Sequence, residues 1–190
     1  MTFAAPTQLK ARSLASIVLA VGLLTPPGAR DVFAQTAKDV TVKAALLYNF
    51  AKFAEWPALR PGEPIVVCIV GNDSIAEAFI AAVRGQEISG HRLELGRPRD
   101  SAAWPSCHLL FIAAVQFRES PGGLAGIKAA PVLTVSDGSG FARSGGIIEL
   151  FVDNGLMRFV INLDAVERSG LQLSSRLLGL AKVIRDPTVE

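Results

Sequence analysis

The sequence predicts a single α/β domain, in which a mixed, mostly parallel β-sheet has helices on both faces and ends in a late β-hairpin. Short continuous runs of β-branched and apolar residues alternate with helical patterns, as expected for strands that are covered on both faces. Near the C-terminus, Asp153-Asn154-Gly155 separates two apolar runs, which is a strong signal for a hairpin turn. The chain has 190 residues and half of them are hydrophobic, which is enough for one core.

Residues 1–34 have the layout of a secretory signal peptide. Lys10 and Arg12 precede the apolar run Ser13–Leu24, and small residues lead to a cleavage site after Ala34. This apolar run is shorter than the roughly 20 residues that cross a bilayer, which argues against the alternative of an uncleaved anchor. We therefore expect a signal peptide over 1–34 and a soluble exported domain over 35–190, with no direct membrane insertion after cleavage.

The charge of the chain excludes two classes of partner. The whole sequence has 19 basic and 17 acidic residues, and the leader holds three of the basic and one of the acidic ones, so the mature chain has 16 of each. A net charge of zero gives no electrostatic reason to expect binding to nucleic acid or to lipid headgroups.

The first half of the mature chain predicts a helix and then a strand–turn–helix unit. Apolar residues at helical spacing predict an amphipathic helix over Asp39–Glu55, capped by Asp39 or Thr41 and ended by Trp56-Pro57. Ile65–Val70 reads as a buried strand, and Gly71-Asn72-Asp73 as a turn. Ser74 and Glu77 form a candidate capping box for a helix that reaches about Arg84.

The rest of the chain predicts five more strands and two short helices. We expect the strands at His91–Leu95, Cys107–Ala113, Pro131–Val135, Ile147–Val152 and Leu156–Leu163. One helix covers Ala165–Arg168 and stops at Gly170, and the other starts at Ser174-Ser175 and continues to Ile184.

The two cysteines, Cys68 and Cys107, lie in predicted buried strands of an exported protein. Disulfides persist in oxidising compartments, and we therefore expect these cysteines to form a bridge rather than two separate buried thiols. A zinc site could be drawn from both cysteines with His91 and His108, but the spacings do not match the close ligand pairs of structural zinc sites. We expect no metal.

Catalytic and cofactor motifs are missing from the sequence. Gly71 is a lone glycine after its strand, without the glycine-rich fingerprints of nucleotide sites. A hydrolase would have to use His91 or His108, and no nucleophile–base–orienter set can be assembled around either. We expect no enzyme activity and no cofactor.

Two regions are candidates for binding a partner or ligand. The glycine-rich loop Ser136–Gly146 follows a strand, where α/β ligand sites often lie, and its candidate residues are Ser136, Asp137 and Arg143. Tyr48 and Trp56 need not share the apolar face of the first helix, and either could anchor a partner.

Several motifs in order along the mature chain resemble one known family. The opening motif is Lys43-Ala44-Ala45, Tyr48-Asn49-Phe50-Ala51-Lys52-Phe53 and Glu55-Trp56-Pro57. The middle motifs are Leu133-Thr134-Val135-Ser136-Asp137 with Gly140-Phe141-Ala142, and Gly145-Gly146 with Ile148. The closing motif comprises Arg158-Phe159, Ile161-Asn162-Leu163, Gly170-Leu171, Leu173-Ser174-Ser175 and Leu177-Leu178. Together they resemble the YfiR-like family of periplasmic proteins over nearly all of the mature chain.

The resemblance implies an exported, non-catalytic regulator. It would bind the periplasmic sensor region of an inner-membrane diguanylate cyclase of the YfiN type, repress cyclic-di-GMP synthesis and so limit biofilm formation. The resemblance also implies an α/β fold, a tendency to form a homodimer and a family bridge between Cys68 and Cys107. A second bridge of the family, around the double glycine, is missing because Ala142 and Glu149 lie on either side of Gly145-Gly146. The alternative is a periplasmic small-ligand-binding protein that feeds a different membrane sensor.

Overall fold

A computed structural model of the chain describes residue 1 and residues 28–120 and 122–186, and the side chains from residue 38 onward. The predicted apolar core of the leader, Ser13–Leu24, lies outside the described residues. In the described part of the chain, no helix is both long and apolar enough to cross a membrane.

The main sheet has eight strands in the order β10-β8-β7-β6-β5-β2-β4-β3. Its parallel centre is β4 (His91–Gly96), β2 (Ile65–Val70), β5 (Leu109–Ile112) and β6 (Leu133–Ser136), with β7 (Ile148–Asp153) parallel to β6. Next come β8 (Leu156–Asn162), antiparallel to β7, and β10 (Lys182–Ile184), parallel to β8; at the other end, β3 (Glu87–Ile88) is antiparallel to β4. The predicted mixed, mostly parallel sheet is confirmed.

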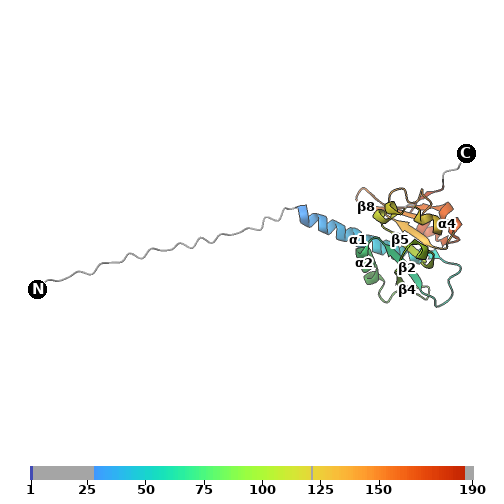
Figure 1. Cartoon of the computed structure of the whole chain (residues 1–190), viewed down its shortest axis with the longest axis horizontal. Helices are drawn as coiled ribbons and strands as arrows, with labels where there is room; N and C mark the ends of the chain where they lie inside the picture. Colours follow the sequence, from blue (N-terminus) through green and yellow to red (C-terminus); the bar gives the residue numbers. More distant parts are fainter. Residues whose placement is uncertain (2–27, 121, 187–190) are drawn as a thin grey trace.

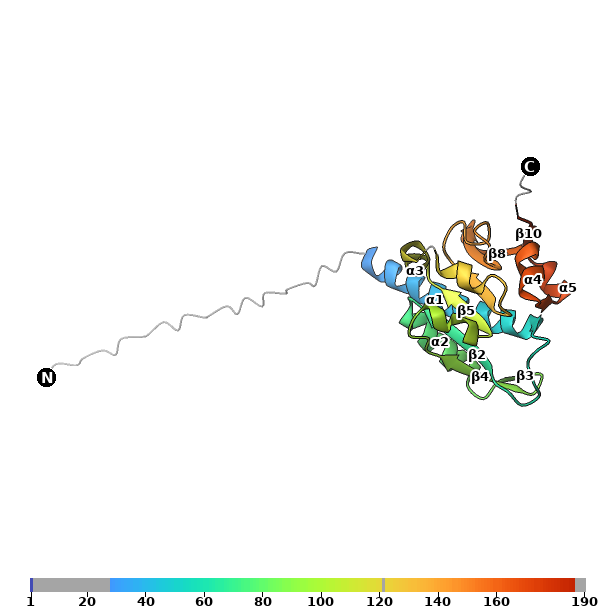
Figure 2. The same cartoon turned by 45° about the vertical axis from the view of Figure 1, so that its right-hand side comes forward.

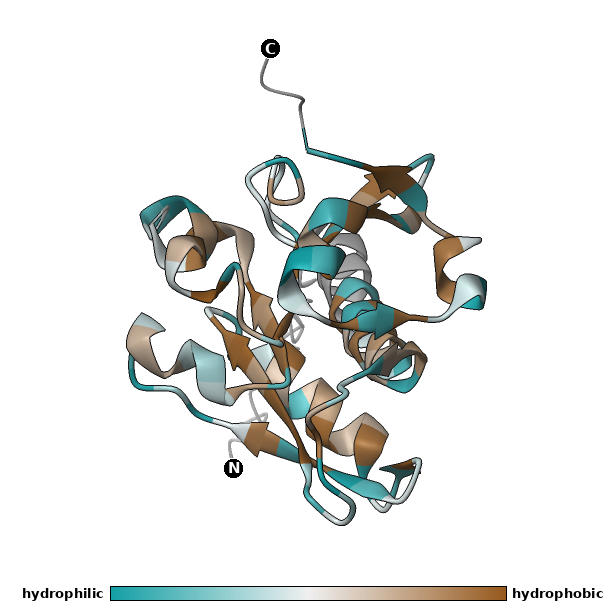
Figure 3. Cartoon of the chain, turned by 90° about the vertical axis from the view of Figure 1, so that its right-hand side faces the viewer, coloured by the Kyte–Doolittle hydropathy of each residue, from teal (hydrophilic) through white to brown (hydrophobic). Residues whose placement is uncertain are grey.

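Helical segments cover both faces of this sheet (Figures 1 and 2). The elements on one face are α1 (Gly28–Phe53) and α2 (Asp73–Val83), which pack on alternate residues of β2, β5 and β6. On the other face are the 3₁₀ segments η1 (Ser101–Ser106) and η2 (Gly123–Ile127), with α3 (Ala114–Glu119). Figure 3 shows hydrophobic strands at the centre and more hydrophilic helices and turns around them. Each face therefore has its own buried cluster, as expected for strands that are apolar on both sides.

The C-terminal part adds short elements at the edge of the sheet. They are α4 (Leu163–Ser169), β9 (Gln172–Leu173) and α5 (Ser175–Leu178), and β9 pairs antiparallel with β1 (Ala54–Glu55). Asn162 accepts hydrogen bonds from the first turn of α4, and Gly170 ends it in the left-handed conformation, at φ 68°. The predicted stop at Gly170 is confirmed.

Three predicted boundaries are wrong. The first helix runs from Gly28 to Phe53 rather than over Asp39–Glu55. It ends two residues before the predicted end because Ala54 and Glu55 pair with β9. Neither Asp39 nor Thr41 caps this helix, since both lie inside it. Asn72, not the Ser74 and Glu77 pair, caps α2, and its side chain accepts a hydrogen bond from the Ile75 N–H at 3.0 Å.

The predicted last helix is also wrong beyond Leu178. After α5 the chain turns at Gly179 and forms β10, which lies beside β8 with Val183 opposite Ile161. Pairing with β8 makes this segment a strand, and the helical spacing of a few apolar residues carries no information about that pairing.

The predicted hairpin is confirmed. β7 and β8 pair from Ile148↔Ile161 to Asp153↔Leu156, and Asn154 and Gly155 form the two-residue turn between them. Both turn residues have positive φ, 50° and 76°, which matches the twist of the flanking strands.

Candidate partner-binding site at the carboxyl end of β6

The loop Ser136–Gly146 begins where β6 ends, and Asp137 fixes its start. One carboxylate oxygen of Asp137 accepts the Ala114 N–H at 2.7 Å, and the other lies 2.7 Å from the Lys43 Nζ. Asp137 therefore joins this loop to the first residue of α3 and to the middle of α1.

Lys43 lies between two carboxylates. Its ammonium group is 2.7 Å from Asp137 and 2.7 Å from Asp39, one turn earlier on α1, and its side chain is only 12% exposed. Burial alone would lower the pKa of Lys43, but the hydrogen bonds and charges of Asp137 and Asp39 outweigh it, so that the pKa is raised above its usual 10.5. Lys43 is therefore charged at neutral pH and ties α1 to the loop.

Several polar groups in and around the loop form hydrogen bonds within the domain. The Ser136 hydroxyl is buried and accepts the Gly138 N–H at 2.9 Å. The carboxylate of Glu149, on β7, accepts the N–H groups of Gly140 and Ala142 at 3.1 and 3.0 Å. Asn162 donates to the Ala142 carbonyl at 2.8 Å. These bonds hold the loop in one conformation.

Packing also fixes the loop. Phe141 is fully buried, and a Cβ added to Gly146 would lie 2.1 Å from the Cε1 atom of its ring. Glycine is thus required at position 146 because the ring occupies the place of a side chain.

The structure places the five predicted binding residues in different surroundings. Arg143 is exposed on the loop and, among the described residues, forms no ion pair. Asp137 and Tyr48 are partly buried. Ser136 and Trp56 are both buried, and their side chains bond to Gly138 and to His108, respectively. Ser136, Asp137 and Arg143 therefore lie on one loop but in different surroundings, and Trp56 lies outside that loop.

Trp56 belongs to a cluster around His108. The Trp56 Nε1–H donates to the His108 carbonyl at 2.9 Å, and the two rings meet edge to face at 6.0 Å. The Val66 N–H donates to the His108 Nδ1 at 3.0 Å. Burial lowers the pKa of His108, and the charge of His91 adds to this effect against the opposing charge of Glu63, so the ring is neutral near pH 7.

Cys68 and Cys107 form a disulfide, with their Cα atoms 5.9 Å apart. The bridge lies in the buried cluster with Trp104, and a Cβ on the neighbouring Gly96 would come within 2.7 Å of the Cys68 Sγ. Oxidised sulfurs are not thiolate ligands, so the bridge excludes the zinc site drawn from these cysteines. In the part of the chain that the structure describes, no cluster of three or more His, Cys, Asp or Glu side chains could hold a metal ion.

The site residues that sequence reasoning missed are Lys43, Glu149 and Asn162. Glu149 and Asn162 lie in strands that are mostly apolar. A polar side chain in such a strand needs an internal partner, and this was the signal available in the sequence. Lys43 gave no such signal, since lysines are common on amphipathic helices.

A comparison with models of protein families shows which family the chain belongs to. The model of the YfiR/HmsC-like family matches residues 40–182. The chain belongs to the YfiR/HmsC-like family. This match includes the loop, Lys43, the disulfide and the hairpin.

A solved structure is also similar to this member of the YfiR/HmsC-like family. It is the crystal structure of a conserved domain protein from Vibrio cholerae O1 biovar El Tor strain N16961, with 15% sequence identity and a TM-score of 0.48. The match covers 76% of this chain and 59% of that chain.

Proposed function

We propose that this protein is exported, binds the periplasmic sensor region of an inner-membrane diguanylate cyclase of the YfiN type and represses cyclic-di-GMP synthesis. The observation that carries the proposal is the family match over residues 40–182. The protein would act without chemistry, by binding the inactive conformation of the cyclase better than the active one.

The loop Ser136–Gly146 supports this proposal as part of the binding surface. Glu149 and Asn162 hold its backbone and Lys43 holds the carboxylate of Asp137, so little conformational freedom would be lost when a partner binds. Arg143 is exposed on this rigid loop without an ion pair among the described residues, and Tyr48 is partly exposed on α1. We assign Arg143 as the first contact to test.

The alternative, a small-ligand-binding protein that feeds another membrane sensor, has less support. A ligand cradle needs free donors and acceptors, whereas Ser136, Asp137 and the amides of Gly140 and Ala142 already bond within the domain. A thermal-shift screen with metabolites and nucleotides is expected to give no rise in melting temperature.

The experiment is gene deletion with complementation in the native host, with cyclic-di-GMP as the readout. Deletion is expected to raise cyclic-di-GMP, the wild-type gene to restore the low level, and Arg143→Glu to restore it only in part. Arg99→Glu is the matched control, because Arg99 is also exposed and lies outside the loop. If deletion leaves cyclic-di-GMP unchanged while a cyclase with a periplasmic sensor is expressed, the proposal is wrong.

Two further parts of the proposal concern the mature protein. We propose cleavage after Ala34, which would leave Gln35–Phe53 of helix α1 on the domain. Sequencing the N-terminus of protein isolated from the periplasm tests this. A tendency to form a homodimer is proposed from the family alone, and sedimentation of the mature protein tests it.

A further inference from the structure

Strand β4 is open along much of one side. On its inner side, toward the centre of the sheet, β4 pairs with β2 from Ile65↔Leu93 to Cys68↔Gly96. On the outer side, β3 covers only His91 and Arg92, and its chain then leads back toward α2. In the part of the molecule that the structure describes, Leu93–Gly96 therefore has a neighbouring strand on one side only.

The open side presents backbone groups that fit another strand. Ser89 and Gly90 form a two-residue turn with positive φ at both positions, and Ile88↔His91 is the pair that closes it. Because hydrogen-bonding direction alternates along a strand, the peptide groups of Leu93 and Leu95 face the open side. A row of such groups is a template for strand addition.

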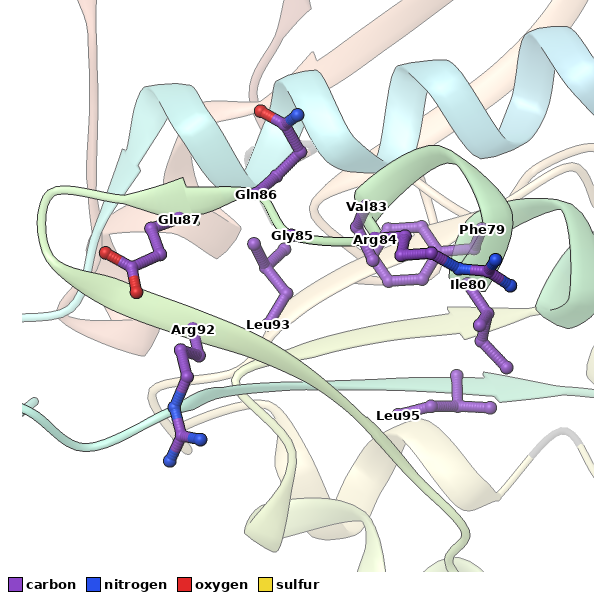
Figure 4. A pocket seen from close by; sticks show the side chains of 10 residues that line it. All are labelled: Phe79, Ile80, Val83, Arg84, Gly85, Gln86, Glu87, Arg92, Leu93 and Leu95. Atoms are coloured by element: carbon purple, nitrogen blue, oxygen red, sulfur yellow. The ribbon is translucent and has the colours of Figure 1, made fainter.

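A groove runs between this open edge and helix α2, mainly apolar beside β3 and more polar at the carboxyl ends of β2 and β4. It consists of two adjoining hollows of about 310 and 470 Å³, which share Ile80 and Leu95. Figure 4 shows the side chains of Phe79, Ile80 and Val83 from α2 near those of Leu93 and Leu95 from β4. Ile80 is 40% exposed although it is apolar. An added strand would thus find apolar contacts for its side chains beside the hydrogen bonds for its backbone.

The two ends of the groove carry opposite charge. The hollow next to the β3–β4 turn is lined by two arginines and one glutamate, a net charge of +1: Arg84, Arg92 and Glu87. The hollow at the carboxyl ends of β2 and β4 is lined by two acids and one arginine, a net charge of −1: Asp73, Glu77 and Arg97. A complementary segment has its acidic end near the turn and its basic end near the start of α2.

We propose that this α2–β4 groove binds an extended segment of a partner protein, which adds as an antiparallel strand to Leu93–Gly96. An antiparallel segment continues the ladder that β3 begins, and its amino end lies next to Asp73 and Glu77. The segment carries apolar side chains at alternate positions, a basic residue at its amino end and an acidic residue at its carboxyl end. The inference goes beyond the proposed function, because it holds for any protein partner with such a segment.

The test uses two peptides of the same composition on the oxidised mature protein. One is acetyl-KVTVTVE-amide, which has the proposed charge order, and the other is acetyl-EVTVTVK-amide. In ¹H–¹⁵N NMR titrations, the first is expected to shift the amides of Leu93–Gly96 and to bind about tenfold more tightly than the second, or about 1.4 kcal/mol. Methylating the peptide nitrogens on one edge of its strand, tested for each edge in turn, is expected to abolish these shifts for one of the two edges.

Variants of the protein test whether the first peptide binds in the α2–β4 groove. Ile80→Glu is expected to weaken binding of the first peptide at least about tenfold, because it places a charge among the apolar walls. Ala81→Glu is the matched control, since Ala81 is exposed on the same helix and does not line the groove. Equal binding of the two peptides, shifts outside the groove, or no shifts at about 2 mM peptide, well above the Kd of an ordinary peptide site, would overturn the inference. A change of oligomeric state in Ile80→Glu would assign the groove to a second copy of the chain and would also overturn it.

Discussion

At the scale of single residues, Gly146 is a glycine of the family motif that packing requires. The ring of Phe141 fills the space in which any other residue at position 146 would have its Cβ, with 2.1 Å to the nearest ring atom. Phe141 itself packs edge to face on Phe117, and so cannot move without disturbing that contact. Overpacking of this kind costs about 1–3 kcal/mol.

We therefore predict that Gly146→Ala lowers the free energy of unfolding in urea by about 1–3 kcal/mol. Gly126→Ala is the control, because a Cβ at Gly126 meets no atom within 4 Å. It should change the free energy by less than about 0.5 kcal/mol. Equal effects of the two substitutions would show that the Phe141 contact is not what requires glycine.

The burial of His108 predicts how the stability of the fold depends on pH. Its pKa is lowered in the folded protein, chiefly by burial, from an ordinary value of 6.5. The unfolded chain therefore binds a proton at higher pH than the folded chain does, so stability is lost as the pH falls below about 6.5 toward the folded pKa. The Val66 N–H bond to Nδ1 would be lost on protonation.

The measurement is urea unfolding at several values of pH between about 7.5 and 5. His108→Gln is expected to remove part of the fall in stability below pH 6.5, whereas His91→Gln should retain most of it, because burial is the main cause of the lowered His108 pKa. The slope with pH is compared rather than the absolute stability, because either variant can lose other contacts. An unchanged slope in His108→Gln would contradict the assignment.

At the scale of elements, Lys43 couples α1 to the loop after β6. Lys43→Met would leave the partly buried Asp137 without its cation and is predicted to lower the free energy of unfolding by about 1–3 kcal/mol at pH 7. The pKa of Lys43 is raised in the folded state, so the difference from wild type should persist up to pH 10.5 and shrink as the pH rises through the folded pKa. Lys52→Met, at an exposed position of the same helix, serves as the control. A loss as small as that of Lys52→Met would argue against the coupling.

The disulfide couples β2 to the segment that enters β5. It closes a loop across a sequence separation of 39, and the chain-entropy model gives about 4 kcal/mol for a loop of this length. The double substitution Cys68→Ala with Cys107→Ala should lower the free energy of unfolding by about that amount. Because both sulfurs are buried, the native protein should also resist mild reductants that do reduce the unfolded chain. Rapid reduction of the native protein would contradict this.

The elements also show where sequence reasoning succeeds. β2 and the β7–β8 hairpin could be predicted, because a continuous apolar run and an Asn-Gly turn are local signals. β10 and the β1–β9 pair could not, since they exist only through pairing with distant strands. In the candidate site, Asp137 was predicted from its place after a strand. The roles of Lys43 and Glu149 depend on tertiary contacts that no spacing in the sequence encodes.

At the scale of the whole molecule, the domain presents two surfaces on one rigid sheet. The loop Ser136–Gly146 follows β6, near the middle of the strand order, and the α2–β4 groove lies near the end formed by β4 and β3. The sheet between them is buried on both faces, which holds the two surfaces in a fixed relation. A protein that represses a membrane sensor by binding needs such a fixed surface more than it needs a catalytic group.

The most direct test is isothermal titration calorimetry of the oxidised mature protein with the purified periplasmic sensor region of the diguanylate cyclase from the same cell. The proposed function predicts one saturable binding event, weakened by Arg143→Glu and unchanged by Arg99→Glu. The absence of binding heat at several temperatures, together with separate elution of the two proteins on size-exclusion chromatography, would contradict it.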